Sequence, residues 1–381
     1  MTGARENEMT VTKLRPLANG LLVLLFATSL LVGQQHSGGE EHLLYVASPG
    51  IRNYTQYGGV GLLVFDIDHG FRFLKRIPTW DVPPGQQPEN VKGIAASAET
   101  GRIYVTALHR MMALDAVTGK KLWDKVYEGG CDRLAISPDG TVLFVPQLEG
   151  NLWHVVYAAT GALIAQIESK SGSHNTICSL DGSKVYLAGL RSPVLLVADA
   201  KDQKVVSTVG PFSNFIRPFT INGADTLCFV NVDGLLGFEV GDLRTGRKLY
   251  RVEVQGYRQG AVKRHACPSH GIALTPDEKE LWVADGANNS LHVFDATVMP
   301  PSQTSSIQLR DMPGWISFSM DGRFAYSSTG EIIDVATKKI VAVLQDEAGR
   351  QVQSEKMLDL AIANGRVVRA GNQFGVGMKQ K

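Results

Sequence analysis

The chain has 381 residues, with 38 Lys and Arg against 37 Asp and Glu and a formal net charge of +1. This near-neutral balance argues against functions that depend on bulk charge, such as nonspecific binding of nucleic acid or of an anionic membrane surface. Any function that depends on charge must therefore come from a local cluster of residues.

The first 33 residues differ from the rest of the chain. Lys13 and Arg15 precede an apolar run over residues 21–32. This run is shorter than the about 20 apolar residues that span a bilayer core, and the pattern is typical of an export signal. We expect a signal peptide or an uncleaved N-terminal anchor over 1–33 and a linker over 34–42. The expected location is periplasmic or secreted, with membrane attachment only if the leader is retained.

A segment of about forty residues recurs from residue 43 onward. Its clearest copies align on residues 137–140, 180–182, 275–278 and 320–322, three of which contain an Asp-Gly pair. Each copy reads as an alternating apolar strand, a turn, and two further strands. A repeat of this length with about four short strands is typical of a β-propeller blade. The sequence therefore predicts an all-β fold.

The number of blades follows from counting the repeats. The predicted sheet segments are residues 43–79, 91–127, 132–168, 173–209, 215–254, 269–309 and 314–345. The first segment lacks its innermost strand, and residues 357–362 form an inner strand that no complete blade follows. We therefore predict a seven-bladed β-propeller over 43–370, closed by the C-terminal strand completing the first blade, with a tail over 371–381.

Several strands carry a family resemblance. Residues 44–47, 61–66 and 281–285 read LYVA, GLLVFD and LWVAD. They resemble the YVTN-type seven-bladed β-propeller family, which is related to the propeller subunit of quinoprotein amine dehydrogenases. The resemblance implies the fold and, as one alternative function, an accessory propeller subunit of a redox enzyme. In the amine dehydrogenases the quinone lies on another chain, so no cofactor is expected on this one.

A polar ring is predicted at one end of the central channel, where the loops leading into the inner strands converge. Counting seven residues back from each turn Asp, and aligning the weaker repeats, predicts which residues lie there. These mouth residues are Lys92, Asp132, His174, Arg217, His270, Gly314 and Lys356, with Arg133, Asn175 and Trp315 next to them.

The composition of this ring points to an anion. A funnel lined by one sign of charge attracts the opposite sign, and Arg and His form charge-assisted hydrogen bonds to carboxylate or phosphate oxygens. We expect an exported, non-enzymatic propeller that binds a small anionic molecule or a protein partner there. The alternative interpretation is that these side chains pair across the channel and hydrate it.

A hydrolase is the main alternative among enzymes. Residues 268–277, with His270 at the channel mouth, resemble the seven-bladed lactonases. The resemblance implies that His270 acts as general base, Asp285 orients the water and Arg217 binds a substrate phosphate. Asp285 lies one position earlier than the acidic residue of that family.

The segment around His270 also raises the question of a metal. His265, Cys267 and His270 fall within six residues and are candidate ligands. An extended chain makes it hard for the two imidazoles to converge, so no metal site is expected.

Two other features lead to structural expectations. Cys131, Cys178, Cys228 and Cys267 fall in four different repeats without a CxxC motif, which argues against a redox dithiol. Buried free thiols are expected, with disulfides between blades as the alternative. The loop over residues 49–59 is rich in Tyr and Gly, and we expect it to form a rim over the channel.

Overall fold

A computed structural model describes residues 39–262, 264 and 267–379. The predicted leader over 1–33 lies outside these residues. Among the described residues the structure contains one short helix, the 3-10 turn η1 (Thr55–Tyr57). None of the described residues forms a helix with the length and apolar character needed to cross a bilayer.

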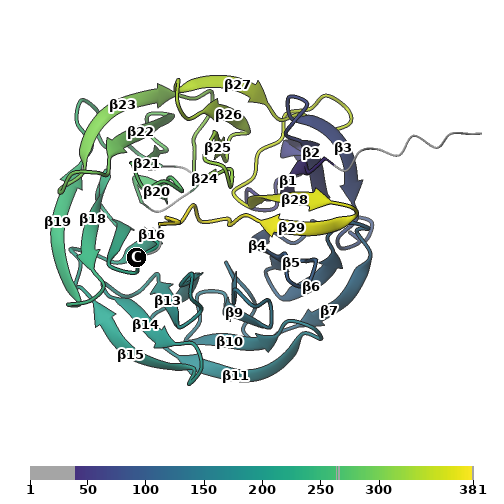
Figure 1. Ribbon diagram of the computed structural model, residues 1–381, viewed down its shortest axis with the longest axis horizontal. Coiled ribbons are helices and arrows are strands. Elements are labelled where there is room, and N and C mark those ends of the chain that lie inside the picture. The colour runs from purple at the N-terminus through teal and green to yellow at the C-terminus, as the bar shows by residue number, and fades with distance from the viewer. Residues whose placement is uncertain (1–38, 263, 265–266, 380–381) are drawn as a thin grey trace, which may run out of the picture. The chain divides into compact units, whose positions relative to one another are not determined.

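Seven antiparallel sheets surround a central channel, as Figure 1 shows. The all-β, seven-bladed fold predicted from the repeat is confirmed. From the channel outward, blade 1 is β29 (Arg366–Ala370), β28 (Met357–Ala363), β1 (Glu41–Ser48), β2 (Gly61–Asp66) and β3 (Arg72–Ile77); blade 2 is β4 (Val91–Ser97), β5 (Arg102–Ala107), β6 (Arg110–Asp115) and β7 (Lys121–Val126); blade 3 is β8 (Ala135–Ile136), β9 (Val142–Pro146), β10 (Leu152–Tyr157) and β11 (Ala162–Glu168).

The remaining four blades have the same order of strands. Blade 4 is β12 (Ser173–Cys178), β13 (Lys184–Gly189), β14 (Leu195–Asp199) and β15 (Lys204–Val209); blade 5 is β16 (Ile216–Ile221), β17 (Leu227–Val232), β18 (Gly237–Asp242) and β19 (Arg247–Glu253); blade 6 is β20 (Ser269–Leu274), β21 (Glu280–Asp285), β22 (Ser290–Asp295) and β23 (Ser302–Gln308); blade 7 is β24 (Ile316–Phe318), β25 (Phe324–Ser327), β26 (Glu331–Asp334) and β27 (Lys339–Val343).

The repeated Asp closes the turn between the first and second strands of a blade. In blade 3 the carboxylate of Asp139 accepts hydrogen bonds from Ser137 Oγ at 2.5 Å and from the backbone N–H of Thr141 at 3.1 Å. Gly140 between them has a φ of 71°, which favours glycine. The same Ser-to-Asp hydrogen bond recurs from Ser179 to Asp181. The sequence motif that identified the repeat is thus a turn motif.

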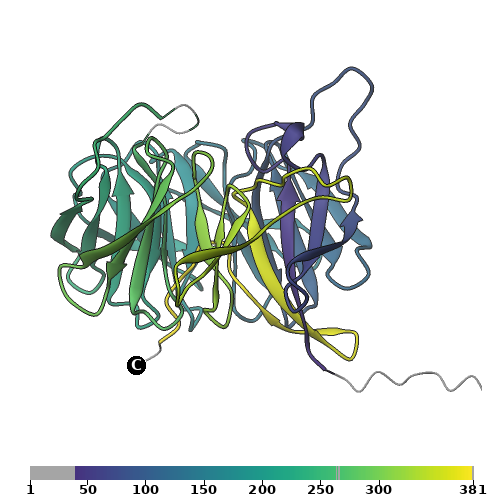
Figure 2. The same ribbon diagram turned by 90° about the horizontal axis from the view of Figure 1, so that it is seen from above.

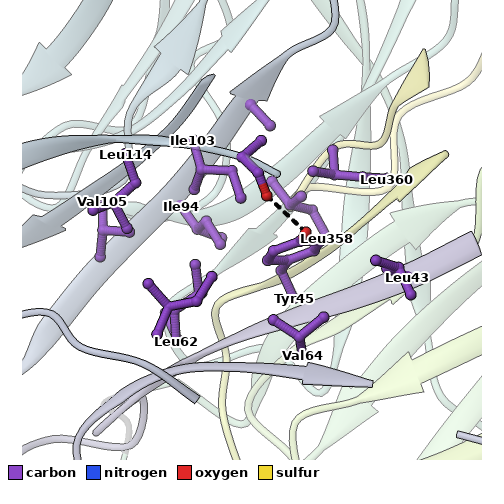
Figure 3. Close-up of a cluster of buried hydrophobic side chains, with 14 of the residues drawn as sticks. Leu43, Tyr45, Leu62, Val64, Ile94, Ile103, Val105, Leu114, Leu358 and Leu360 are labelled. Carbon is purple, nitrogen blue, oxygen red and sulfur yellow. Dashed lines mark hydrogen bonds between the residues drawn. The ribbon is translucent and has the colours of Figure 1, made fainter. Parts of the chain in front are cut away.

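The C-terminal strand completes blade 1, as the missing inner strand predicted. β28 pairs antiparallel with β1, with Leu358 opposite Tyr45. Figure 3 shows the apolar cluster that this pairing closes, in which Leu358 and Leu360 lie beside side chains of blades 1 and 2. Tyr45 Oη donates a hydrogen bond to the carbonyl of Ala116 at 2.9 Å, which joins the two blades.

The chain then continues into the channel. β29 adds a fifth strand on the inner side of β28. Beyond it, residues 371–378, here called the crossing segment, run across the centre of the ring to blades 5 and 6, and Figure 1 shows this stretch in yellow. Gly375 O accepts hydrogen bonds from Thr220 Oγ1 and from the backbone N–H of Leu274. The crossing segment therefore links opposite sides of the ring.

The four cysteines are free thiols, and none forms a disulfide in the structure. Cys131, Cys228 and Cys267 are fully buried, and Cys178 is half-buried. Burial raises the pKa of the Cys178 and Cys228 thiols to about 12. These thiols are therefore protonated near neutral pH and react slowly with electrophiles.

Candidate functional site

The pairing register identifies equivalent positions in the seven blades. One strand of every blade carries a buried aromatic residue, and its partner on the adjacent inner strand fixes the register. This is the second strand of blades 2 to 7 and β1 of blade 1. These aromatic residues are Tyr45, Tyr104, Phe144, Tyr186, Phe229, Trp282 and Tyr326. Counting three residues back from each inner-strand partner gives one position per blade at the mouth of the channel.

This register places six of the predicted mouth residues at equivalent positions and gives a different residue in blade 1. Lys92 lies three residues before Ala95, the partner of Tyr104. The residue three positions before Leu358, the partner of Tyr45, is Glu355 rather than Lys356. Lys356 lies one position deeper in the channel. Blade 1 therefore places a carboxylate at the mouth where the sequence alignment predicted a cation.

The channel mouth thus consists of two layers of seven positions. The upper layer is Lys92, Asp132, His174, Arg217, His270, Gly314 and Glu355. The lower layer, one residue further along each strand, is Gly93, Arg133, Asn175, Pro218, Gly271, Trp315 and Lys356.

Asp132 is the centre of one group of charges in the upper layer. Its side chain is 1% exposed, with His174 Nδ1 at 2.7 Å from Oδ2 and Lys92 Nζ at 3.6 Å from Oδ1. Burial opposes the ionisation of Asp132, but Lys92 and His174 outweigh it, and the pKa of Asp132 is lowered. Burial also lowers the pKa of His174 below 6.5, against the pull of Asp132. At neutral pH, the His174 ring therefore donates its Nδ1–H to an ionised Asp132.

Glu355 is the centre of a second group, which extends into the lower layer. Arg133 Nη2 lies 2.6 Å and Lys356 Nζ lies 3.0 Å from Glu355 Oε2, and all three residues are at most 5% exposed. Lys356 Nζ also donates to the carbonyl of Gly50 at 2.8 Å. Burial lowers the pKa of Lys356 to about 8, although Glu355 opposes this shift. Glu355 thus compensates two buried cations.

Trp315 closes the channel beneath these charges. The Arg133 guanidinium carbon lies 3.3 Å from the centre of the Trp315 ring, which is the geometry of a cation–π contact. Trp315 Nε1 donates a hydrogen bond of 2.6 Å to the carbonyl of Gln373 in the crossing segment. The lower layer is therefore a plug that joins the mouth to the C-terminal part of the chain.

Arg217 and His270 have separate partners. Arg217 forms a two-pronged ion pair with Asp233, with Nε–Oδ1 at 2.5 Å and Nη2–Oδ2 at 2.6 Å. Nδ1 of His270 lies 2.9 Å from the carbonyl oxygen of Gly314, so Nδ1 carries the proton and donates it. This hydrogen bond fixes the orientation of the His270 ring at the mouth.

The structure does not bring Asp285 together with His270. The Asp285 carboxylate contacts His292 Nε2 at 3.1 Å and Asn288 Nδ2 at 2.6 Å. His292 is on β22, one strand further from the channel than Asp285 on β21. The carboxylate that the lactonase resemblance assigned to orienting water is therefore engaged inside the blade.

The metal candidates do not form a cluster that the structure can describe. His265 lies outside the described residues, and Cys267 is fully buried with Sγ 2.5 Å from the carbonyl of Ser269. Among the residues that are described, no group of three or more His, Cys, Asp or Glu side chains is arranged to hold a metal ion.

A rim of loops borders the mouth on the side of blades 1, 6 and 7. Arg264 Nη2 donates to Asp311 Oδ2 at 2.8 Å and to Tyr57 Oη at 3.0 Å, and Arg52 Nη2 donates to the carbonyl of Arg264. The Tyr- and Gly-rich loop over 49–59 thus lies in this rim. Figure 2 shows the loops between β3 and β4 and between β19 and β20 rising from the same face, with the C-terminus at the opposite face.

The mouth is closer to charge balance than the sequence predicted. Its four fixed cations, Lys92, Arg133, Arg217 and Lys356, face three carboxylates, Asp132, Asp233 and Glu355. Sequence reasoning missed Asp233, which follows the second strand of blade 5, and Glu355, which precedes Lys356. The aromatic residue next to each inner strand would have identified Glu355.

Exposure differs between the bases and the two buried acids. The side chains of Lys92, His174 and Arg217 are 16%, 12% and 14% exposed, against 1% for Asp132 and 7% for Glu355. The groups that solvent reaches in the upper layer are therefore predominantly basic, and these two acids of the same layer are more deeply buried.

Comparison with known proteins identifies the fold and no family. No protein-family model matches the chain, and no curated protein matches it. Among solved structures, a chain of hydrazine synthase from Kuenenia stuttgartiensis matches with a TM-score of 0.56 and 15% identity, covering 77% of this chain and 90% of that chain. A likeness at this identity shows a shared β-propeller fold, which hosts many unrelated functions.

Proposed function

We propose that the protein is a binding or accessory β-propeller that takes a small anion, a carboxylate or a phosphate, at the mouth of its channel. The observation that carries this proposal is the difference in exposure between the bases and the acids. The side chains of Lys92, His174 and Arg217 are partly exposed, whereas those of Asp132 and Glu355 are almost completely buried. Asp233 is 20% exposed, but both of its carboxylate oxygens are paired with Arg217. An anion that reaches the mouth therefore meets mainly basic groups.

The buried acids support such a site rather than abolish it. Asp132 holds Lys92 and His174 in place, and Asp233 holds the Arg217 fork. Side chains that are already oriented lose less entropy on binding, and charge-assisted hydrogen bonds to an anion are stronger than neutral ones. His270, held by Gly314, adds a second imidazole of fixed orientation at the same circle.

The wider setting of this function is also proposed. The basic N-terminal residues and the apolar run over 21–32 support an exported protein, periplasmic or secreted. The strand motifs that resemble the YVTN-type propellers support a protein partner on the same face as an alternative to the small anion. In that alternative the chain is an accessory subunit whose redox cofactor belongs to another chain.

Calorimetric titration with citrate, succinate and glucose 6-phosphate tests the anion site. We expect one of these anions to bind with an affinity that rises as pH falls below about 6.5, because protonated imidazoles add positive charge. Arg217→Lys weakens binding because a single ammonium group cannot keep the two-pronged pair with Asp233 and also donate to the anion, and His270→Ala also weakens it. Lys204→Ala, an exposed cation on the outer strand β15, is the matched control. Binding that ignores pH and both mouth variants would rule out this site.

A lactonase-like hydrolase is the second candidate. It is supported by the hydrogen bond from His270 Nδ1–H to Gly314 O, which selects the tautomer in which Nε2 carries the lone pair that a general base needs. The engagement of Asp285 with His292 argues against it. Lactone hydrolysis that persists in His270→Ala would exclude this residue as the base.

A further inference from the structure

A cavity lies at the end of the channel opposite the mouth, between the crossing segment and the inner strands. Its volume is about 520 Å³, and we call it the base cavity. Most of its wall comes from the ends of β4, β8 and β12, and residues 369–378 cover it on the remaining side. Volumes of this size are typical of small-molecule sites, whereas a packed interior tolerates few voids larger than a water molecule.

The path of the crossing segment explains why this space remains open. Its backbone lies against blades 5 and 6, where Gly375 O accepts from Leu274 N and Gly377 N donates to Ile221 O. On the other side it reaches blades 2 and 3 through one side chain, Gln373. The crossing segment therefore spans the space next to the inner strands of blades 2 to 4 without filling it.

The sequence of the inner strands enlarges the same space. The register makes Ala96 of blade 2 and Cys178 of blade 4 equivalent to Leu274 of blade 6. Both line the cavity. Short side chains thus stand on the open side at positions where blade 6 carries a leucine.

The wall is apolar in character, although several serines contribute to it. Ser137, Ser179 and Ser319 donate their hydroxyl protons to the turn carboxylates of their own blades, at 2.5, 2.6 and 2.6 Å. The Gln373 amide is also used, because Oε1 accepts from Ile94 N and Nε2 donates to Leu134 O. These polar groups of the wall are therefore already engaged with the protein.

Charged residues lie only at the exposed edge of this wall. Among the described lining residues, Glu99 and Arg369 alone carry charge near neutral pH, both are exposed, and Arg369 is paired with Glu40. A charged group deep in the cavity would lose its hydration without gaining a partner, which costs several kcal/mol. The chemistry of the wall therefore selects against ions.

We propose that the base cavity is a second binding site, for a small uncharged and predominantly apolar molecule. The side chains of Phe318, Phe374 and Met320 supply flat and adaptable apolar contact, and Ala96 and Cys178 leave the room. This site is separate from the anion site, because Trp315 and the crossing segment stand between the two ends of the channel.

Fluorescence titration with 1-N-phenylnaphthylamine, a neutral apolar dye, tests the proposal on the full chain. We expect a saturable rise in emission with the wild-type protein. Ala96→Leu and Cys178→Leu each install the residue of blade 6 in the cavity and should weaken the dye by about tenfold or more, which corresponds to 1.4 kcal/mol. Ala162→Leu, the same enlargement as Ala96→Leu at an exposed position of β11, should leave the affinity unchanged.

The outcomes separate the two sites and remain decisive if a variant misfolds. His270→Ala should not change dye binding, so failure of the anion site leaves this proposal intact. In the wild-type protein at pH 9, where more of the half-buried Cys178 thiol is ionised, bound dye should slow its reaction with N-ethylmaleimide, followed by peptide mass, because that thiol lines the cavity. No saturable emission, equal affinity in folded leucine variants, or alkylation of Cys178 at the same rate with and without dye would each overturn the proposal.

Discussion

The two ends of the channel use the same seven inner strands for opposite purposes. At the mouth, the residues leading into the strands are mostly ionisable, and Asp132 and Glu355 compensate the cations around them. At the base, the residues leaving the strands are mostly small or apolar, and the crossing segment bridges them. A blade repeat constrains backbone register and inter-blade packing, so the few residues that face the channel can differ between its ends.

The difference also concerns how each end is held together. The mouth depends on separate ion pairs. Asp132 and His174 join neighbouring blades, Arg217 and Asp233 lie in one blade, and Arg133 and Glu355 join blades 3 and 1. The base depends on one continuous piece of chain that contacts distant blades, with Gln373 on one side and Gly375 on the other. Loss of one pair should therefore disturb the mouth locally, and loss of the crossing segment should weaken the whole ring.

Truncation should give the largest effect. Removing residues 371–381 deletes the Gln373 and Gly375 hydrogen bonds and the buried Phe374 side chain, and we expect the free energy of unfolding to fall by at least about 3 kcal/mol. Removing residues 355–381 also takes β28 out of blade 1 and should leave no cooperatively folded protein. Thermal and urea unfolding measure both.

Val368→Ala, on the exposed face of β29, is the control for this truncation series. Its melting temperature should stay near that of the wild-type protein. A chain lacking 371–381 with the melting temperature of the wild-type protein would show that the crossing segment does not stabilise the ring.

The mouth of the channel could be predicted from the sequence to a greater extent than the base. The turn at Ser137 to Gly140 and its copies identify the blades because the turn requires those residue types. The mouth positions follow by counting from that turn, since all blades share one register. Counting fails in blade 1, because its inner strand β28 is followed by β29 and not by such a turn leading into β1. The sequence therefore predicted Lys356 at the position that Glu355 occupies.

The base was not predictable in the same way. Residues 371–378 have no alternating pattern, and their contacts with Leu134, Thr220 and Leu274 join positions far apart in the sequence. The partner of Arg217 was missed for a similar reason, since Asp233 comes from the loop after a different strand. Local patterns specify turns and strands, and long-range pairing depends on the closed ring.

A substitution that removes one charge at the mouth without changing side-chain shape should give the next largest effect. Glu355→Gln leaves Arg133 and Lys356 buried without their carboxylate, and breaking a buried pair in this way costs about 3–5 kcal/mol. Asp233→Asn, at the more exposed pair with Arg217, should cost only about 1 kcal/mol. Urea unfolding of the two variants at pH 7 gives the comparison.

The ratio of these two losses in unfolding free energy tests whether burial makes the Glu355 carboxylate more important than that of Asp233. Equal losses would mean that the Arg133, Lys356 and Glu355 group depends on its carboxylate no more than the Arg217–Asp233 pair does. A loss at Glu355 that disappears when Lys356→Met is added would identify Lys356 as the cation that requires the acid.

The smallest effect is expected at the base and depends on pH. Asp359 on β28 is buried, its Oδ2 accepts from Met320 N at 2.9 Å, and its Oδ1 has no hydrogen-bond partner in the described part of the chain. Burial raises the pKa of Asp359 to about 6, with Asp321 adding to the shift and His42 opposing it. In the unfolded chain the same carboxyl titrates near 3.9.

The sign of the effect follows from these two pKa values. Between about pH 4 and 6 the folded protein holds a proton on Asp359 that the unfolded chain has lost. The free energy of unfolding therefore falls progressively as pH rises, and the loss is complete above pH 6.

Asp359→Asn keeps a neutral side chain at every pH and retains an acceptor for Met320 N. We expect the variant to match the wild-type protein near pH 4 and to exceed it by up to about 3 kcal/mol at pH 7, since each unit of pKa difference corresponds to about 1.4 kcal/mol. Because His42 also titrates near this range, the measurement is the difference between the two proteins at each pH, by urea unfolding. A difference that does not change between pH 4 and 7 would mean that Asp359 ionises in the folded ring as easily as in the unfolded chain, and that the base accepts a charge as readily as the mouth does.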